Sequence, residues 1–212
     1  MRPLSVQVWG ETACFTRPEH KVERVSYPVM TPSAARGVLE AIYWKPEFEW
    51  VVTGIDVLRP IRWHSFTRNE VNRRATGSVG FVASAARTQR HTVALRDVAY
   101  VIRAWQEPRP HEKEGVVRHR DVFRRRVERG RCFHRPYLGC REFAAHFGPA
   151  VTGNAHPIDE TVDLGPMLLD LNYDPDGSGR GTPVFFDAML QEGTLVEARS
   201  SRLPRRPLSR KV

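Results

Sequence analysis

A stretch of alternating apolar and polar residues in the middle of the chain restricts the fold more than any other feature of the sequence. Within Val93–Gln106, the residues Val98, Tyr100, Ile102 and Ala104 recur at every second position. This period places all four side chains on one face of a β-strand. Because a strand with one apolar face needs a second layer to cover it, we expect a half-buried sheet flanked by helices.

The first half of the chain contains further patterns of the same kind. Leu4, Val6 and Val8 alternate with polar residues, which predicts a strand, and the polar segment 11–26 that follows predicts a loop. Thr31-Pro32 predicts a helix start, since Thr is a favourable N-cap and Pro fits the first turn. The apolar positions of this helix have helical spacing, and they are Ala35, Val38, Leu39 and Ile42. Two strands rich in β-branched and aromatic residues are predicted next, at Phe48–Leu58 and Ile61–Phe66.

A second helix is predicted over Glu112–Arg129, with Gly130 at the position of a helix-ending glycine. At 100° per residue, its apolar stripe consists of Val116, Phe123 and Val127. His119 lies about 60° from the centre of that stripe, at the border between core and solvent. A histidine at such a border is held by packing and still reaches a ligand.

These segments follow one another in the order strand, helix, strand, strand, helix, strand, with the last strand predicted at Tyr137–Phe147. This order is the βαββαβ arrangement of a ferredoxin-like α+β domain, here residues 1–147, with a hairpin around residues 60–95 inserted between its second and third strands. Within that region, Arg68–Arg90 is rich in Asn, Gly, Ser, Thr and Arg, which predicts a long mobile basic loop. Residues 148–200 alternate turn residues with short apolar pieces, and they predict a small antiparallel β domain. The Arg/Pro-rich residues 201–212 are predicted to be a mobile basic tail.

Positive charge is concentrated between Arg109 and Arg141. That segment has a local net charge of +7, against +9 for the whole chain, whose sequence pI is about 10.1. Such a block is typical of a phosphate-binding surface, and arginine suits bidentate phosphate contacts and base stacking. No apolar run is long enough to span a bilayer, and no amphipathic helix with large apolar residues predicts membrane binding.

Three cysteines are too few and too scattered for a disulfide framework, and the N-terminus has no signal-peptide core, so we expect a reducing cytoplasm. We expect these cysteines to be buried thiols. One alternative is a zinc site built from Cys132, His134, Cys140 and His146, although the spacing is not that of a usual zinc motif.

Nucleotide-binding and hydrolase motifs are absent from the sequence. The nearest approach to a carboxylate cluster is Asp170, Asp174 and Asp176, which lie in a turn-like context where Asp is expected. RNA can be cut without a metal, because its own 2′-OH can attack the adjacent phosphorus. That reaction needs a proton-transfer group, a cation and an orienting group. The right residue types occur at His119, Arg118 and Tyr43, with His134 and His64 as alternative histidines.

Two segments carry a specific resemblance. Ala41-Ile42-Tyr43-Trp44-Lys45-Pro46 and the stretch 131–143, RCFHRPYLGCREF, resemble those of CRISPR-associated RAMP proteins of the Dvulg subtype, from type I-C systems. The resemblance extends from the VQVWG strand to the PVFFDAML region, which is nearly the whole chain. It implies an RRM-related ferredoxin-like domain followed by a small β domain.

The resemblance also implies an activity. Members of this family cut precursor CRISPR RNA at the base of the repeat stem-loop without metal or cofactor. They retain the 5′ handle of the mature RNA and join the interference complex with its other subunits. The family's catalytic tyrosine and histidine fall on Tyr43 and His119, and its catalytic lysine falls on Arg118. Arginine keeps the charge, but it does not exchange protons at ordinary pH.

We therefore expect a metal-independent endoribonuclease in which His119 is the acid/base, Tyr43 orients the sugar or phosphate, and Arg118 stabilises the transition state. RNA-binding residues are expected along the basic segment at Arg124, Arg125, Arg126, Arg129, Arg131, His134 and Arg135. Two alternatives stay open. One is a non-catalytic subunit that holds the RNA handle, which the exchange at Arg118 favours. The other is a protein that binds double-stranded DNA, or a metal-dependent DNase, suggested by the basic loop and tail.

Overall fold

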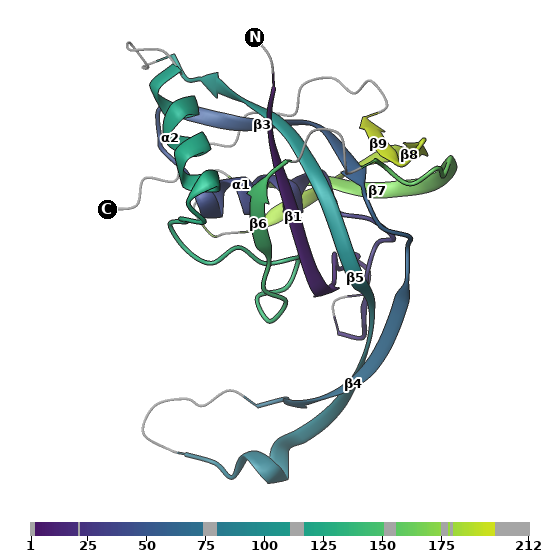
Figure 1. Cartoon of the computed structure of the whole chain (residues 1–212). Helices are drawn as coiled ribbons and strands as arrows, with labels where there is room; N and C mark the ends of the chain where they lie inside the picture. The colour runs from purple at the N-terminus through teal and green to yellow at the C-terminus, as the bar shows by residue number, and fades with distance from the viewer. Residues whose placement is uncertain are drawn as a thin grey trace.

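The computed structural model describes residues 3–20, 22–73, 80–110, 117–150, 156–174, 178 and 180–197. These residues form a mostly antiparallel sheet with two α-helices and one 3₁₀ helix (Figure 1). The strands are β1 (Leu4–Ala13), β2 (Arg24–Val25), β3 (Phe48–Val57), β4 (Trp63–Val71), β5 (Arg87–Pro108), β6 (His146–Pro149), β7 (Val162–Tyr173), β8 (Gly181–Gln191) and β9 (Thr194–Glu197). The helices are α1 (Pro32–Ile42), η1 (Ala83–Ala86) and α2 (Val117–Glu128).

The sheet has the order β6-β1-β5-β3-β9-β8-β7, and β2 and β4 also pair with β5. Its central strand is β5, whose alternating residues from Val98 to Ala104 are buried as their period predicts. β1 pairs with β5 in the register Val6↔Ile102 and Val8↔Tyr100. β3 lies on the other side of β5, with Ile55 opposite Ile102. The predicted strand is therefore confirmed, but Ala99 and Val101 are buried as well, so both of its faces are covered between Val98 and Ile102.

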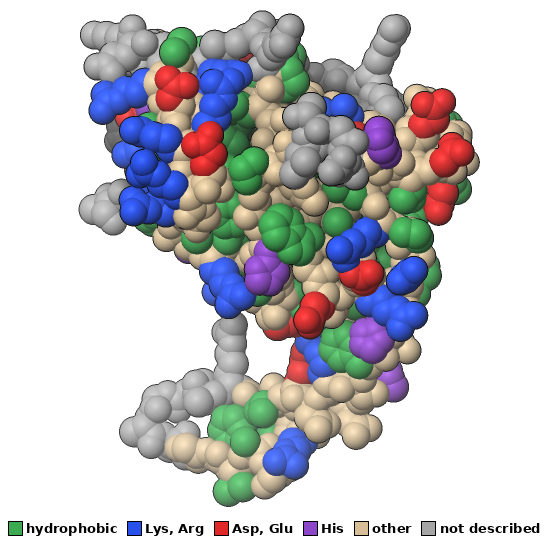
Figure 2. Space-filling model, in the orientation of Figure 1, with side chains coloured by type: hydrophobic (Ala, Val, Ile, Leu, Met, Phe, Trp, Pro, Cys, Tyr) green, Lys and Arg blue, Asp and Glu red, His purple; other side chains and the backbone are tan. Residues whose placement is uncertain are grey.

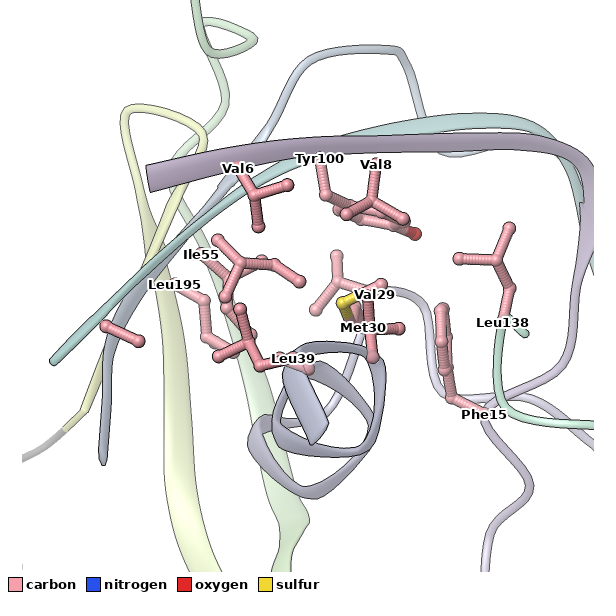
Figure 3. Close-up of a cluster of buried hydrophobic side chains, with 14 of the residues drawn as sticks. Val6, Val8, Phe15, Val29, Met30, Leu39, Ile55, Tyr100, Leu138 and Leu195 are labelled. Carbon is pink, nitrogen blue, oxygen red and sulfur yellow. The ribbon is translucent and has the colours of Figure 1, made fainter. Parts of the chain in front are cut away.

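The core lies between this sheet and α1 (Figure 3). Val6 and Tyr100 point from the sheet toward the helix, and Leu39 points back from α1. All three are buried, and burial of one large apolar side chain contributes roughly 1.5–3 kcal/mol. The helix begins as predicted, because the backbone N–H of Ala34 donates to the Oγ1 atom of Thr31 at 3.2 Å. α1 ends at Ile42, so the chain leaves the helix immediately before the candidate catalytic tyrosine.

The predicted hairpin around residues 60–95 is present, but the prediction of a long loop over Arg68–Arg90 is wrong at both ends of that segment. β4 continues to Val71, and β5 already begins at Arg87, so the two strands form a hairpin that projects from the body of the molecule (Figure 1). Cross-strand pairing explains this extended backbone, because Thr67 lies opposite His91 and Val71 lies opposite Arg87 although most of the neighbouring residues are polar. The polar loop predicted before it, over residues 11–26, also contains the end of β1 and the short strand β2.

The prediction of a strand over Tyr137–Phe147 is wrong for most of its length. Only β6 is a strand there, and it pairs with β1 through Trp9↔His146. The preceding residues form a loop that includes Gly139 at a φ of +83°. A Cβ atom on Gly139 would lie 2.0 Å from the carbonyl oxygen of Cys14, so only glycine permits this close approach. The glycine turn therefore determines a loop here, although the apolar residues of the segment favour a strand.

The later strands have the predicted antiparallel pattern. β7 pairs with β8 and β8 pairs with β9, while β9 also pairs with β3, so these strands extend the same sheet. An ion pair between Arg36 and Asp170 joins α1 to β7. The basic tail 201–212, the start of the second predicted helix at 112–116 and Asp176 lie outside the described residues. In the described residues, no helix has both the length and the apolar character needed to cross a membrane.

Candidate functional site

The candidate site lies where the end of α1 meets the first turn of α2. The hydroxyl of Tyr43 and the Nδ1 atom of His119 are 2.9 Å apart, which is hydrogen-bond distance. The two rings are tilted by 37°, with their centroids 6.0 Å apart. Two of the three residues chosen from the sequence for catalysis are therefore brought together.

Carbonyl groups in the last turn of α1 hold this arrangement through hydrogen bonds. The carbonyl oxygen of Leu39 accepts the backbone N–H of Tyr43 at 2.9 Å, and that of Ile42 accepts NH1 of Arg126 at 2.7 Å. The carbonyl oxygen of Ala41 accepts the backbone N–H of Phe133 at 2.9 Å. Helix ends leave four carbonyls without helical partners. Here those carbonyls join the tyrosine, α2 and the loop that follows α2.

An aromatic layer lies behind the pair. The ring of Phe48 is 5.1 Å from the ring of His119 and 5.8 Å from the ring of Tyr43. Trp50 Nε1 donates to the carbonyl oxygen of Tyr43 at 2.9 Å, and its ring packs 4.7 Å from the ring of Phe123. Phe48 and Trp50 both lie at the start of β3. The imidazole is therefore fixed on one side by packing and on the other by the tyrosine hydroxyl.

Burial dominates the electrostatics of the tyrosine. Tyr43 is 4% exposed, and this burial raises the pKa of its phenol, while the charges of Arg126 and Arg118 act in the opposite direction. The guanidinium of Arg126 also lies over the Tyr43 ring, 5.0 Å from its centroid. Tyr43 is therefore a neutral phenol near pH 7, able to donate or accept a hydrogen bond.

Arg118 is in the first turn of α2, directly before His119, and it is exposed. His119 itself is half-buried, as its predicted position at the edge of the apolar stripe requires. The stripe is confirmed by the buried residues Phe123 and Val127, and Gly130 has the expected positive φ of 61°. The predicted Val116 lies outside the described residues.

The other basic residues of this region differ in their surroundings. Figure 2 shows Lys and Arg side chains gathered over α2. Those that are exposed, together with one histidine, are Arg124, Arg125, Arg129, Arg131, His134 and Arg135. Arg126 is half-buried, because it contacts the carbonyl oxygen of Ile42 and the ring of Tyr43. Arg120 is buried, which the helical pattern did not indicate, and burial lowers the pKa of its guanidinium.

The alternative sites chosen from the sequence receive less support. His134 is exposed in the loop after α2, and His64 lies on the hairpin, stacked on Phe66. No group of three or more His, Cys, Asp or Glu residues in the described ranges is arranged to hold a metal ion. Cys132 is exposed, so the prediction of a buried thiol is wrong there, because its loop lies on the surface.

Sequence reasoning missed two exposed aromatic residues next to the site. Phe133 is 79% exposed and Trp44 is 52% exposed. The backbone of Phe133 is held by Ala41, two residues before Tyr43, and Trp44 directly follows Tyr43. Their exposure could not be predicted, because it depends on how the chain folds around them. The sequence did contain one signal, since both residues lie inside the two segments that carry the family resemblance.

Comparison with known proteins adds a family assignment. The Cas5d family model, described as CRISPR-associated protein (Cas_Cas5), matches residues 4–203. A Thermus thermophilus protein named CRISPR pre-crRNA endoribonuclease Cas5d is 47% identical over 210 residues, covering 92% of this chain and 91% of its own length. A Mannheimia succiniciproducens protein of the same name is 40% identical over 213 residues, covering 91% and 93%.

A solved structure also has this fold. The crystal structure of a CRISPR-associated protein matches with a TM-score of 0.69 at 22% identity, covering 93% of this chain and 92% of that one. At this identity, the likeness concerns the mixed α/β architecture with its mostly antiparallel sheet.

Proposed function

The chain belongs to the Cas5d family of CRISPR-associated proteins, and we propose that it is a metal-independent endoribonuclease that cuts precursor CRISPR RNA within the repeat stem-loop. The hydrogen bond between Tyr43 and His119 supports this proposal most directly. It joins a phenol and an imidazole beside a strongly basic helix. Together these supply the orienting group, the proton-transfer group and the cation that cleavage of RNA by its own 2′-OH needs. Two relatives named as pre-crRNA endoribonucleases, at 47% and 40% identity, support the same activity.

In the proposed reaction, the 2′-OH attacks the adjacent phosphorus, and the bond to the 5′ oxygen breaks. The products are a 2′,3′-cyclic phosphate and a 5′-OH end. His119 transfers a proton in this step, since histidine titrates near neutral pH. Tyr43 holds the imidazole in position, so its effect on the reacting sugar or phosphate acts through His119. Arg118 offsets the charge that develops on the phosphorane oxygens.

The exposed cations of α2 and its following loop would bind the RNA backbone. A-form RNA is recognised largely through its shape and its phosphates, which suits arginines spread over a convex helix. Arg124 and Arg125 lie on the exposed face of α2, Arg129 directly follows the helix, and Arg131 and Arg135 continue into the loop. Phe133, beside this surface, would stack on an unpaired base next to the stem.

After cleavage, the protein would keep the 5′ handle of the mature RNA and join the other subunits of a type I-C interference complex. We place this activity in the cytoplasm, where the RNA is made. The strand order β6-β1-β5-β3 supports a ferredoxin-like core for residues 1–147. The antiparallel strands β7, β8 and β9 support a smaller β unit within 148–200, followed by the tail 201–212.

One observation favours a second candidate function. Arg118 stands where the resembling family has a lysine, and a guanidinium does not transfer protons at ordinary pH. If proton transfer by that lysine is essential, the chain would be a non-catalytic subunit that holds the repeat RNA. Cleavage of cognate repeat RNA by purified protein separates the two functions. A single cut within the repeat supports the enzyme, and tight binding without a cut supports the second function.

A further inference from the structure

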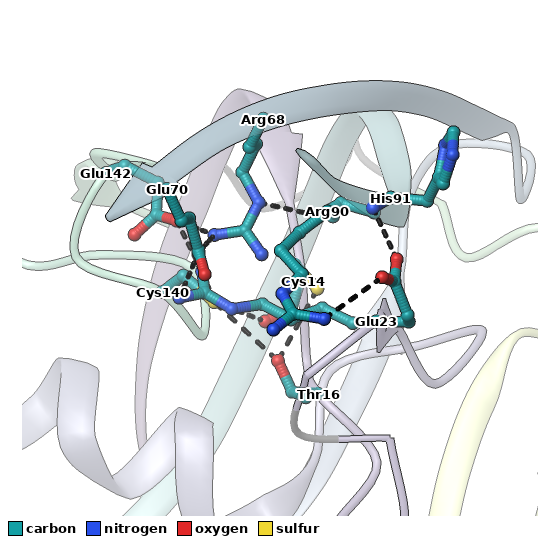
Figure 4. Close-up of polar contacts among 11 residues, drawn as sticks. Cys14, Thr16, Glu23, Arg68, Glu70, Arg90, His91, Cys140 and Glu142 are labelled. Carbon is teal, nitrogen blue, oxygen red and sulfur yellow. Dashed lines mark hydrogen bonds and ion pairs between the residues drawn. The ribbon is translucent and has the colours of Figure 1, made fainter. Parts of the chain in front are cut away.

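Two cysteines from distant parts of the chain meet at the end of β1. Cys14 directly follows β1, and Cys140 lies in the loop that precedes β6 (Figure 4). The Sγ atom of Cys14 is 3.5 Å from the hydroxyl oxygen of Thr16, and the Sγ atom of Cys140 is 3.6 Å from the same oxygen. Both sulfurs therefore face one hydroxyl group.

The backbones at these positions are also close together. The N–H of Cys14 donates to the carbonyl oxygen of Leu138 at 3.0 Å. In its thiol form, Cys140 donates to the carbonyl oxygen of Cys14 at 3.5 Å. The close approach of Gly139 to that same carbonyl brings the two chain segments nearer than any other residue type permits. This proximity matters because a disulfide requires Cα atoms within about 7 Å of each other.

Charged groups surround Cys140 from three elements. NH1 of Arg24, on β2, donates to the Cys140 sulfur at 3.5 Å and to Glu142 at 2.5 Å. Glu70 of β4 is 3.9 Å from Arg24 and 2.5 Å from Arg68. Arg24 is therefore a fixed cation beside the sulfur, and the network joins the loop to the root of the hairpin (Figure 4).

We propose that Cys140 and Cys14 form a peroxide-sensitive thiol pair, in which Cys140 is the attacking thiolate and Cys14 resolves it to an intramolecular disulfide. The oxidant is hydrogen peroxide. This reaction is independent of the RNA chemistry at Tyr43 and His119, because it uses neither residue.

The electrostatics of the pair support these roles. Hydrogen bonding from Cys14 lowers the pKa of Cys140 to about 6, with further lowering by Thr16 and Arg24, against opposing effects of burial and Glu142. The same hydrogen bond and burial raise the pKa of Cys14. Cys140 is half-buried and Cys14 is fully buried, so peroxide reaches Cys140 first. The thiolate is the form of cysteine that attacks an oxidant.

The chemistry balances with one peroxide per disulfide. The Cys140 thiolate attacks one peroxide oxygen, the O–O bond breaks, and water leaves after taking up a proton. Cys140 is then a sulfenic acid, and the peroxide is reduced. The sulfur of Cys14 attacks the sulfenic sulfur, its proton leaves with the hydroxyl as a second water, and the S–S bond forms.

The test uses the full chain with Cys132→Ser, which removes the exposed third thiol and leaves only the proposed pair. Treatment with hydrogen peroxide should lower the intact mass by two hydrogen atoms, and peptide mapping should recover the Cys14 and Cys140 peptides linked together. Dithiothreitol should restore the original mass. Closing so long a loop should raise the Tm by several degrees.

Single substitutions separate the two roles. In Cys132→Ser/Cys14→Ser, the mass should rise by one oxygen atom, and a dimedone adduct should appear at Cys140. In Cys132→Ser/Cys140→Ser, peroxide should leave the mass unchanged. Arg24→Gln should slow the reaction of Cys140 with iodoacetamide by roughly tenfold at pH 6.5, where its thiolate depends on the cation.

Three results would overturn the proposal. They are a folded Cys132→Ser protein that keeps both thiols in excess peroxide, a sulfenic acid found at Cys14 rather than at Cys140, and linked peptides that join two molecules. Peptide mapping is done on the Cys132→Ser protein, so the detection of the disulfide does not depend on the folding of Cys14→Ser.

Discussion

The hydroxyl of Tyr43 lies 2.9 Å from Nδ1 of His119, although the two residues are 76 positions apart in the chain. Tyr43 is fixed at the end of α1, and His119 is fixed in the first turn of α2. We expect the two side chains to act as one unit. Tyr43→Phe keeps the ring packing and removes the hydroxyl, so cleavage should slow by roughly 10²-fold while RNA affinity and Tm stay close to wild type.

If Tyr43 and His119 act as one unit, the effects of their substitutions on the cleavage rate should not multiply. Single-turnover cleavage by Tyr43→Phe, by His119→Ala and by the double variant measures this directly. The double variant should be no slower than His119→Ala, because the tyrosine acts through the imidazole. Losses that multiply would instead assign Tyr43 a separate contact with the RNA.

The charge at Arg118 should matter more than its identity. Arg118→Gln should slow cleavage by roughly tenfold to a hundredfold, because it removes a cation from the phosphorane. Arg118→Lys should cleave at least as fast as wild type, with unchanged binding. An inactive wild type that becomes active as Arg118→Lys would identify proton transfer as the missing step.

The exposed face of α2 should set the salt dependence of RNA binding. Replacing Arg125 and Arg129 together by Gln removes two phosphate contacts, so the negative slope of log K against log salt should become less steep by about 1.4–1.8. Arg180→Gln, an exposed arginine between β7 and β8, is the matched control and should leave the slope unchanged. Equal slopes for all three proteins would place the RNA elsewhere.

Phe133 should contribute to binding without contributing to stability. Its side chain is 79% exposed, so Phe133→Ala should change the Tm very little. Loss of one stacked base should weaken binding of repeat RNA by roughly fivefold or more. Phe185→Ala, which removes an exposed ring of β8, is the control, and an equal effect of both would argue against a specific base contact.

Buried tyrosines should make the fold sensitive to alkali. Burial raises the pKa of Tyr43 and of Tyr100. The unfolded chain ionises its tyrosines near pH 10, so above about that pH the unfolded state releases protons that the folded state retains. The contribution of these groups is therefore fully present below about pH 10 and is lost as the pH rises further. Between about pH 9 and 11, the Tm of wild type should fall more steeply than the Tm of Tyr100→Phe, which removes a buried phenol. The control is Tyr137→Phe, which removes an exposed phenol, and its Tm should fall in the same way as that of wild type.

Much of the core could be predicted because it depends on local patterns. The alternation around Tyr100 and the Thr31 cap each specify an element without reference to the rest of the chain. A hairpin around residues 60–95 was predicted, but the full length of its strands and the loop before β6 could not be predicted in this way. Val71 and Thr88 become strand residues through cross-strand pairing, and Gly139 forms its turn against Cys14, a contact between distant parts of the chain.

The candidate site was predictable to a similar extent. Helical periodicity placed His119 at the border of the core, and a resemblance singled out Tyr43. Their hydrogen bond could not be read from the sequence, because it depends on how α1 and α2 pack together. The contact of Arg126 with the carbonyl of Ile42 has the same origin, because it also depends on the packing of the two helices.

The central claim is tested most directly by cleavage of cognate repeat RNA in EDTA, beside an RNA that carries a 2′-deoxy group at the scissile nucleotide. We expect one cut in the first RNA, with a 2′,3′-cyclic phosphate at its new end, and no cut in the second. Cleavage of the 2′-deoxy RNA, or an activity that returns only when divalent metal is added, would contradict the proposed chemistry.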